Sequence, residues 1–198
     1  MHTIDPDYLP ELAGTVERFL INHHGELDGM LLRGGPQVHF PPHMGSAVEL
    51  LTKPGDAVRV RGVRPRGVAV VDAVRIENAH GDAVVDQGPP KERKKHEGEK
   101  ARRANAPRRH ACKVKGVVER LLYGPKGDVH GALLGDGTLV RWPPHEGERL
   151  GRSLRMSARI AVRGDALETR FGTVIEARTL GPSKTAMHEL HPKSARTP

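Results

Sequence analysis

The sequence has only one cysteine among its 198 residues, and aromatic side chains make up just 3% of the chain. The single cysteine excludes an internal disulfide framework and a cysteine-based zinc site. No apolar run approaches the roughly 20 residues that a membrane-spanning helix needs. The first ten residues include two aspartates and no apolar stretch, so they do not resemble a signal peptide. We therefore expect a protein of the reducing cytoplasm.

Motifs that carry catalytic chemistry are also missing. The sequence has no glycine-rich loop followed by Lys-Ser or Lys-Thr, and no deaminase signature in which His-x-Glu is followed by a cysteine pair. Its carboxylates are scattered along the chain. We therefore predict a protein that is not an enzyme and that needs no cofactor.

An internal repeat organises the chain. The segment Gly14-Thr-Val-Glu-Arg-Phe-Leu recurs 102 residues later as Gly116-Val-Val-Glu-Arg-Leu-Leu. Without a gap, fifteen of the 33 positions from 14 to 46 are identical in the second copy. Such self-similarity at a fixed offset indicates a duplicated structural unit. We predict domains over 12–82 and 114–182, a linker over 87–113 and a disordered tail over 183–198.

Each copy is predicted to contain five short strands, because apolar and polar residues alternate between glycine-bearing turns. In the first copy these strands cover 14–21, 27–32, 37–40, 57–63 and 68–76. A short helical stretch follows the third strand, at 47–51 in the first copy and 150–156 in the second. Three strands, a short helix and two further strands favour a small closed barrel, so the predicted fold class is all-β with two five-stranded barrels.

A spaced pattern of glycine, apolar residues and a Pro-Pro-His turn occurs in both copies. It comprises Gly14, Val16, Leu20, Gly25, Gly29, Leu32, Gly35, Val38, Phe40, Pro41, Pro42 and His43, and then Gly116, Val118, Leu122, Gly127, Gly131, Leu134, Gly137, Val140, Trp142, Pro143, Pro144 and His145. With this pattern each copy resembles bacterial OB-fold domains. The resemblance implies a five-stranded Greek-key barrel whose second and third strands and adjacent loops bind oligonucleotides or oligosaccharides. It therefore also implies nucleic-acid binding.

Positive charge is concentrated between the two copies. Residues 91–115 contain eleven basic and three acidic residues, which accounts for the whole net charge of +8. Residues 1–90 carry −4 and residues 116–198 carry +4. A segment so poor in apolar residues is expected to be a disordered basic linker, which neutralises phosphates without reading sequence. A solvated spacer between two domains is the alternative.

Candidate nucleic-acid-binding residues follow from these patterns. In the linker they are Lys94, Lys95, Arg102, Arg103, Arg108 and Arg109. In the second copy they are His130, Arg141, Trp142, His145, Arg159 and Arg163, and in the first His39, Phe40, His43, Arg59 and Arg61. Phe40 and Trp142 share the face of the preceding valines, so they belong either to the core or to a stacking site at the barrel mouth. We expect single-stranded DNA or RNA, bound largely without sequence preference and best by the second copy.

Other functions remain open from the sequence. The acidic first copy suggests a protein-interaction module, whose partner could be the second copy or the linker. His23, His24, His39, His43 and Met44 offer ligands for copper or zinc, but of these only His43 has a counterpart in the second copy, so we predict no metal site. A small-ligand-binding barrel is a further alternative. Cys112 stands among basic residues that would lower its pKa, and we interpret it as an incidental linker thiol.

Overall fold

The first copy folds as a closed barrel. The structure, a computed structural model, describes residues 6–88, 108–150 and 154–190. After a 3-10 turn (Pro6–Tyr8), the strands of the first barrel are β1 (Glu11–Ile21), β2 (Leu27–Leu32), β3 (Gln37–His39), β4 (Ala57–Val63), β5 (Val70–Asn78) and β6 (Ala83–Val85). A 3-10 turn (Pro42–Met44) and helix α1 (Gly45–Leu51) connect β3 to β4. The strand order is β3-β2-β1-β4-β5, and parallel pairing of β3 with β5 closes the barrel.

The second copy repeats this topology. Its elements are β7 (Arg109–Tyr123), β8 (Val129–Leu134), β9 (Leu139–Arg141), α3 (Pro144–Leu150), β10 (Arg159–Thr169), β11 (Gly172–Gly181) and β12 (His188–Glu189). Pairing of β10 with β11 closes the order β10-β7-β8-β9-β11. The prediction of an all-β chain with two five-stranded barrels of OB type is confirmed. No helix in the described ranges is long and apolar enough to cross a membrane.

Glycines that recur in both copies occupy positions where the backbones pass too closely for a side chain. A Cβ at Gly29 would lie 2.6 Å from the Val38 carbonyl oxygen, and one at Gly131 would lie 2.7 Å from that of Val140. The same substitution would therefore push strands 2 and 3 apart in either barrel. This close approach explains why the repeat retains glycine at both positions.

Several predicted boundaries differ from the structure. β7 begins at Arg109, so residues 109–113 of the predicted linker belong to a strand, and each of them pairs with a residue of β10. Cys112 is therefore not a linker thiol: its side chain packs against the second core, and burial raises its pKa, contrary to the expectation from its basic neighbours. The helix of the second copy covers 144–150, before the predicted 150–156, and β12 lies in the predicted tail.

The aromatic residues that end strand 3 in each copy lie in the barrel interiors. Phe40 has no exposed surface and Trp142 is 4% exposed. The indole Nε1 of Trp142 donates a hydrogen bond to the Val129 carbonyl. Of the two alternatives for these residues, core position and base stacking, the structure supports core position.

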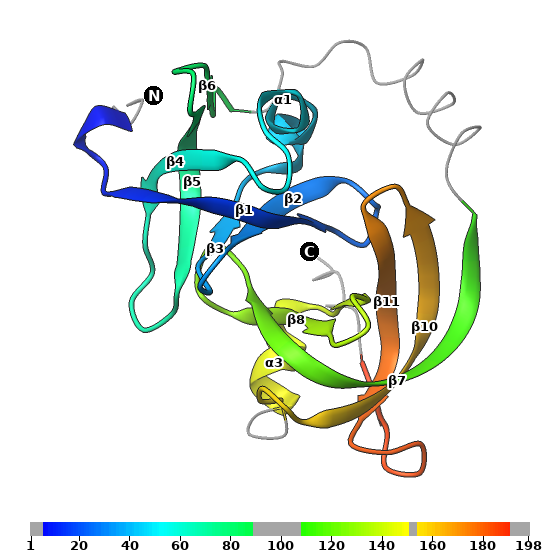
Figure 1. Cartoon of the computed structure of the whole chain (residues 1–198). Coiled ribbons are helices and arrows are strands. Elements are labelled where there is room, and N and C mark those ends of the chain that lie inside the picture. The colour runs from blue at the N-terminus through cyan, green and yellow to red at the C-terminus, as the bar shows by residue number, and fades with distance from the viewer. Residues whose placement is uncertain (1–5, 89–107, 151–153, 191–198) are drawn as a thin grey trace, which may run out of the picture.

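The two barrels pack directly against each other, one above the other in Figure 1. One continuous hydrophobic cluster contains the core of the first barrel together with Leu122, Leu133, Leu139, Leu167 and Val174 of the second. The contacts are reciprocal. Arg18 donates to the Gly137 carbonyl, and its counterpart Arg120 lies beside Gly35, the counterpart of Gly137. Such exchange of equivalent contacts is the signature of an approximately twofold interface.

Oppositely charged side chains also meet across this interface. Three ion pairs between described residues cross it: Asp28–Arg141, Glu17–Arg120 and Glu49–Arg170. In each, the first barrel supplies the acid and the second supplies the base. The negative charge of the first copy is thus partly neutralised by the positive charge of the second.

Candidate nucleic-acid interface

The outer face of strands 2 and 3, where OB folds commonly bind their ligands, is covered in both barrels. The side chains that alternate outward on these strands are buried: Leu31 and Gln37 in the first barrel, and Leu133, Leu139 and Arg141 in the second. The Gln37 amide donates to the Tyr123 carbonyl and accepts from the Tyr123 N–H across the interface. These side chains serve barrel–barrel packing in both copies, whereas His39, the next outward residue of β3, stays partly exposed and lines a cavity of about 1010 Å³ together with His130.

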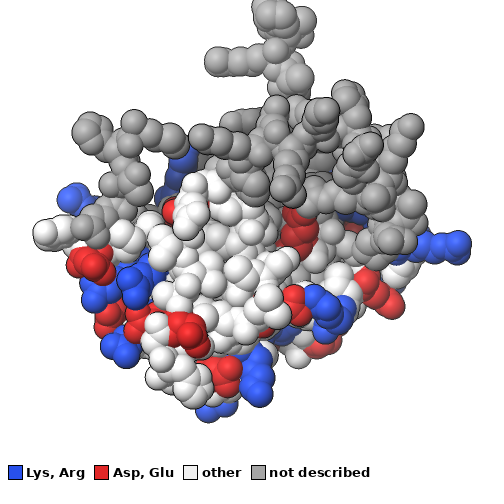
Figure 2. Space-filling view, turned by 90° about the horizontal axis from the view of Figure 1, so that it is seen from above, with Lys and Arg blue, Asp and Glu red and all other residues white. Residues whose placement is uncertain are grey.

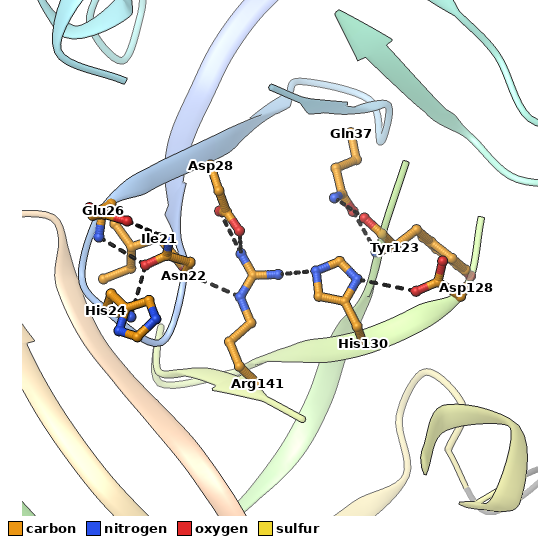
Figure 3. A network of polar contacts seen from close by, with 10 residues as sticks. All are labelled: Ile21, Asn22, His24, Glu26, Asp28, Gln37, Tyr123, Asp128, His130 and Arg141. Atoms are coloured by element: carbon orange, nitrogen blue, oxygen red, sulfur yellow. Dashed lines mark hydrogen bonds and ion pairs between the residues drawn. The ribbon is translucent and has the colours of Figure 1, made fainter. Parts of the chain in front are cut away.

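Arg141 lies at the centre of the polar part of this interface, as Figure 3 shows. Its Nε donates to the Ile21 carbonyl at 2.9 Å. One terminal nitrogen donates to both carboxylate oxygens of Asp28, at 2.7 and 3.1 Å, and the other donates to Nε2 of His130 at 2.7 Å. The sequence places Arg141 and His130 on a ligand surface. The structure instead buries Arg141 to 4% exposure, because Ile21 and Asp28 of the other barrel bind its guanidinium.

Burial sets the protonation of this cluster. It raises the pKa of the Asp28 carboxyl, and the Arg141 guanidinium beside it opposes that rise. Burial, followed by the charge of Arg141, lowers the pKa of His130 to about 3. Because a guanidinium can only donate, Nε2 of His130 must accept and the imidazole is neutral. The cluster therefore holds one charged pair and one neutral imidazole.

Most candidates in the first copy are engaged with carboxylates. His39 contacts Asp72 at 2.9 Å and His43 contacts Asp86 at 2.8 Å. The two arginines of β4 are also paired, Arg59 with Glu77 at 3.6 Å and Arg61 with Glu11 at 2.9 Å. The outer face of this barrel is therefore locally neutralised, and these residues offer little free charge to phosphates.

Of the remaining candidates, His145 lines one cavity together with His39 and His130, whereas the other described ones do not line it. In the second copy, His145 lies 3.6 Å from the buried carboxylate of Glu146. Arg109 pairs with Glu176 and donates to the His23 carbonyl, whereas Arg108 is exposed just before β7. Lys94, Lys95, Arg102 and Arg103 lie outside the described residues, so their role stays a prediction.

The metal and small-ligand alternatives find little support among the described residues. No group of three His, Cys, Asp or Glu side chains there could hold a metal ion. A cavity of about 420 Å³ lies beside Trp142 and Arg141. All three guanidinium nitrogens of Arg141 already donate to protein atoms. The strongest donor of this cavity is therefore not free to orient a ligand.

Free positive charge gathers on the outer face of β7 and β10. Lys113 lies directly opposite Arg163, and Arg159 lies directly opposite Val117. Since directly opposed residues and alternate residues of a strand share a face, Lys113, Lys115, Arg159 and Arg163 project together. All four are exposed, and their side chains make no ion pair or hydrogen bond with any residue that the structure describes. We call these four residues the cationic face.

The cationic face is unfavourable for the isolated protein. Like charges directly opposite one another on neighbouring strands are destabilising, and Lys113 and Arg163 form such a pair. Glu11 and Arg61 occupy the equivalent positions of the first barrel and make an ion pair. The same fold can therefore place an acid at this position, and the second barrel places a lysine there instead.

Other parts of the surface mix the two signs of charge. On the face seen from above in Figure 2, blue and red residues alternate around a mostly uncharged centre, wherever described residues are visible. Sequence reasoning selected Arg159 and Arg163 but missed Lys113 and Lys115 as site residues, because it counted both only as part of the basic segment 91–115. The alternation of Lys113 and Lys115 with Cys112 and Val114 carries the period-two signal of a strand with a charged outer face.

Comparison with known proteins adds no family. No protein-family model and no curated protein sequence matches the chain. Among solved structures, the chain is similar to wild-type single-stranded DNA binding protein from Thermus aquaticus, at 15% identity and a TM-score of 0.26, over 95% of each chain. A deletion mutant of that protein matches at 16% identity and a TM-score of 0.28, over 93% of this chain and 96% of the other. TM-scores this low carry no conclusion, so function has to be argued from the geometry of this chain.

Proposed function

We propose that this tandem OB-fold protein is a non-enzymatic nucleic-acid-binding protein that holds its ligand through phosphate contacts. The observation that carries the proposal is the cationic face, in which four exposed Lys and Arg side chains lack partners among the described residues and two of them stand directly opposite each other. A polyanion relieves this repulsion. The basic residues of 91–108 join the chain immediately before β7, so they extend the same positive region along the sequence.

Phosphate contacts of this kind make a quantitative prediction. Each phosphate neutralised on B-DNA releases counterions and contributes about 0.9 to the slope of log K against log salt concentration. Four contacts from the cationic face would contribute a slope of about 3.6. Contacts to phosphate carry no sequence information, so binding is largely independent of sequence and extends to both DNA and RNA.

A salt titration with matched variants tests this function. Lys113→Gln, Lys115→Gln, Arg159→Gln and Arg163→Gln are combined in one full-length chain. The control chain combines Arg33→Gln, Lys53→Gln, Arg66→Gln and Lys126→Gln, four exposed cations away from the cationic face whose side chains make no ion pair within the described residues. Filter binding of labelled DNA and RNA should show a slope reduced by about 3 to 4 only in the first chain. Equal slopes in the two chains would contradict the proposal.

The linker requires its own variant. Replacing Lys94, Lys95, Arg102 and Arg103 by Gln tests the predicted contribution of 91–108. If the linker neutralises phosphates, this variant also lowers the salt slope, by about 0.9 for each phosphate that is no longer neutralised. If it is a solvated spacer, the slope is unchanged and the cationic face accounts for binding alone.

A further inference from the structure

We infer that this protein contacts only the phosphates of its ligand and leaves the bases untouched, so that it binds double helices at least as tightly as single strands. The inference rests on the proposed function and specifies the ligand class of the same face. It runs against the usual use of OB folds, which bind single strands by combining a positive groove with aromatic stacking platforms.

The first observation is that the cationic face holds no aromatic side chain. Its neighbours on β7 and β10 are Ala111, Val117, Ala161 and Asp165, the last of which is ion-paired with Arg178. None of these has a ring on which a base could stack. Base–aromatic stacking supplies the affinity for unpaired bases in sequence-tolerant single-strand binding, and this face cannot provide it.

The second observation is that, of the Phe, Tyr and Trp residues elsewhere, all except Tyr8 are buried or half-buried. Phe40 and Trp142 lie in the barrel interiors. Phe19 and Phe171 pack edge to face across the barrel interface, with ring centroids 5.8 Å apart. Tyr123 is half-buried, and its backbone is bonded to the Gln37 amide at the interface. The exposed ring of Tyr8 belongs to the N-terminal turn of the first barrel, on the other copy from the cationic face.

The third observation is that barrel–barrel packing covers most of the strand 2–3 face in both copies. In OB folds this surface positions bases over the sheet, and here Leu31 and Leu133 fill it with barrel–barrel contacts. The outer surface of β7 and β10 stays open to a ligand, and four long cationic side chains project there from two adjacent strands. Such a surface can engage the outside of a polymer without requiring its bases to be turned out.

A protein that contacts only phosphates is expected to prefer the nucleic acid with the higher charge density. Duplex DNA carries one charge per about 1.7 Å of helix axis, against about 3.4 Å for each strand. When only phosphates are contacted, the denser polyanion releases more counterions for each contact, with a slope of about 0.9 against about 0.7 for a single strand. Pairing the bases therefore does not weaken binding to this face.

The experiment compares three DNA probes of equal length with the full-length protein in dilute salt. They are a duplex, the same single strand, and a single strand with abasic sites in place of all its nucleotide bases. We expect the duplex to bind at least as tightly as the single strand, and the abasic strand to bind within about twofold of the base-bearing one. One stacked base is worth about 1–3 kcal/mol, which is about fivefold or more in affinity. A preference of about fivefold or more for the base-bearing strand over either other probe would overturn the inference.

The cationic-face variant separates this inference from the proposed function. If the variant binds all three probes as tightly as the matched control does, the proposed function fails, whatever the order of the probes. If it loses affinity for the probes but the wild type still favours unpaired bases, the face binds nucleic acid and the inference alone fails. Thermal unfolding of both variants confirms that a loss of binding does not reflect a loss of fold.

Discussion

The two barrels share a topology but differ in how they treat the same outer surface. On the first barrel, Glu11 neutralises Arg61 across strands β1 and β4. On the second, Lys113 faces Arg163 with no carboxylate between them. The difference shows that the barrel does not require charge of one sign at this position, since both arrangements are compatible with the fold. Divergence of the copies has left the second with a cationic surface and the first with a neutral one.

The two barrels also differ in the residues that they place at the interface. Asp28 and His130 are equivalent positions, as are His39 and Arg141. In the observed pairing, the buried guanidinium of Arg141 meets the carboxylate of Asp28. Two second barrels packed in this way would each bury Arg141 against the His130 of the other, without a carboxylate. Since an unpaired buried charge costs several kcal/mol, the divergence favours association of unlike barrels over like ones.

The largest expected effect comes from removing this asymmetry at the interface. Asp28→Asn leaves the guanidinium of Arg141 buried without a negative partner, and we expect a loss of about 3–5 kcal/mol in the free energy of unfolding. Urea unfolding measures it. The double variant Asp28→Leu with Arg141→Met, which replaces the pair by apolar side chains, should recover most of this loss.

An exposed ion pair across the same interface supplies the control. Arg170→Gln removes the partner of Glu49, and the Arg170 side chain is 71% exposed. Exposed pairs contribute about 0–1 kcal/mol, so this variant should unfold almost as the wild type does. An Asp28→Asn variant no less stable than Arg170→Gln would show that Arg141 does not depend on its carboxylate.

Exchanging the residues that distinguish the outer faces should exchange their binding behaviour. Lys113→Glu removes one cation and gives Arg163 a partner, so the salt slope on duplex DNA should fall by about 1.8, two contacts of about 0.9 each. Glu11→Lys in the first barrel frees Arg61 and should raise the slope. Filter binding across a salt series measures both, and a Lys113→Glu variant that binds as the wild type does would rule out this face as the contact surface.

The smallest expected effect concerns pH. The folded protein binds a proton at His130 only near pH 3, whereas the unfolded chain binds one near the ordinary value of 6.5. Between these two values the unfolded state therefore binds more protons than the folded state does. As a result, the free energy of unfolding is highest above pH 6.5 and decreases as the pH falls. One unit below 6.5 the loss is about 1.4 kcal/mol. Burial lowers the pKa of His23 as well, which adds in the same direction.

Urea unfolding at about pH 7.5 and about pH 5.5 tests this linkage. The groups that face His130 are Arg141, Asp128 and His39, from both barrels. His130→Gln keeps an acceptor for Arg141 and cannot be protonated in this range. Its stability should change less with pH than that of the wild type, and an unchanged pH dependence would assign the effect to other groups.

Much of the fold could be read from repeated local patterns. Alternating residues around Val38 and Val140, and the glycines retained at 29 and 131, specify strands and close approaches that depend on neighbours in the same copy. The start of β7 was missed because residues 109–113 continue the basic composition of the linker and pair with a strand some fifty positions away. The candidate site was found in part, through Arg159 and Arg163. Arg141 was misplaced, because a charge on the outward face of a strand is normally solvated.

By itself, the sequence determined two copies of a small β-barrel and an excess of positive charge between them and over residues 116–198, because periodicity and composition are local properties. Only the tertiary structure decided which outward faces remain exposed. Packing the barrels together buries most of the outer surface of strands 2 and 3 and leaves Lys113, Lys115, Arg159 and Arg163 outside. Burial is a property of the assembled pair, since it depends on which apolar and charged groups of one copy meet those of the other.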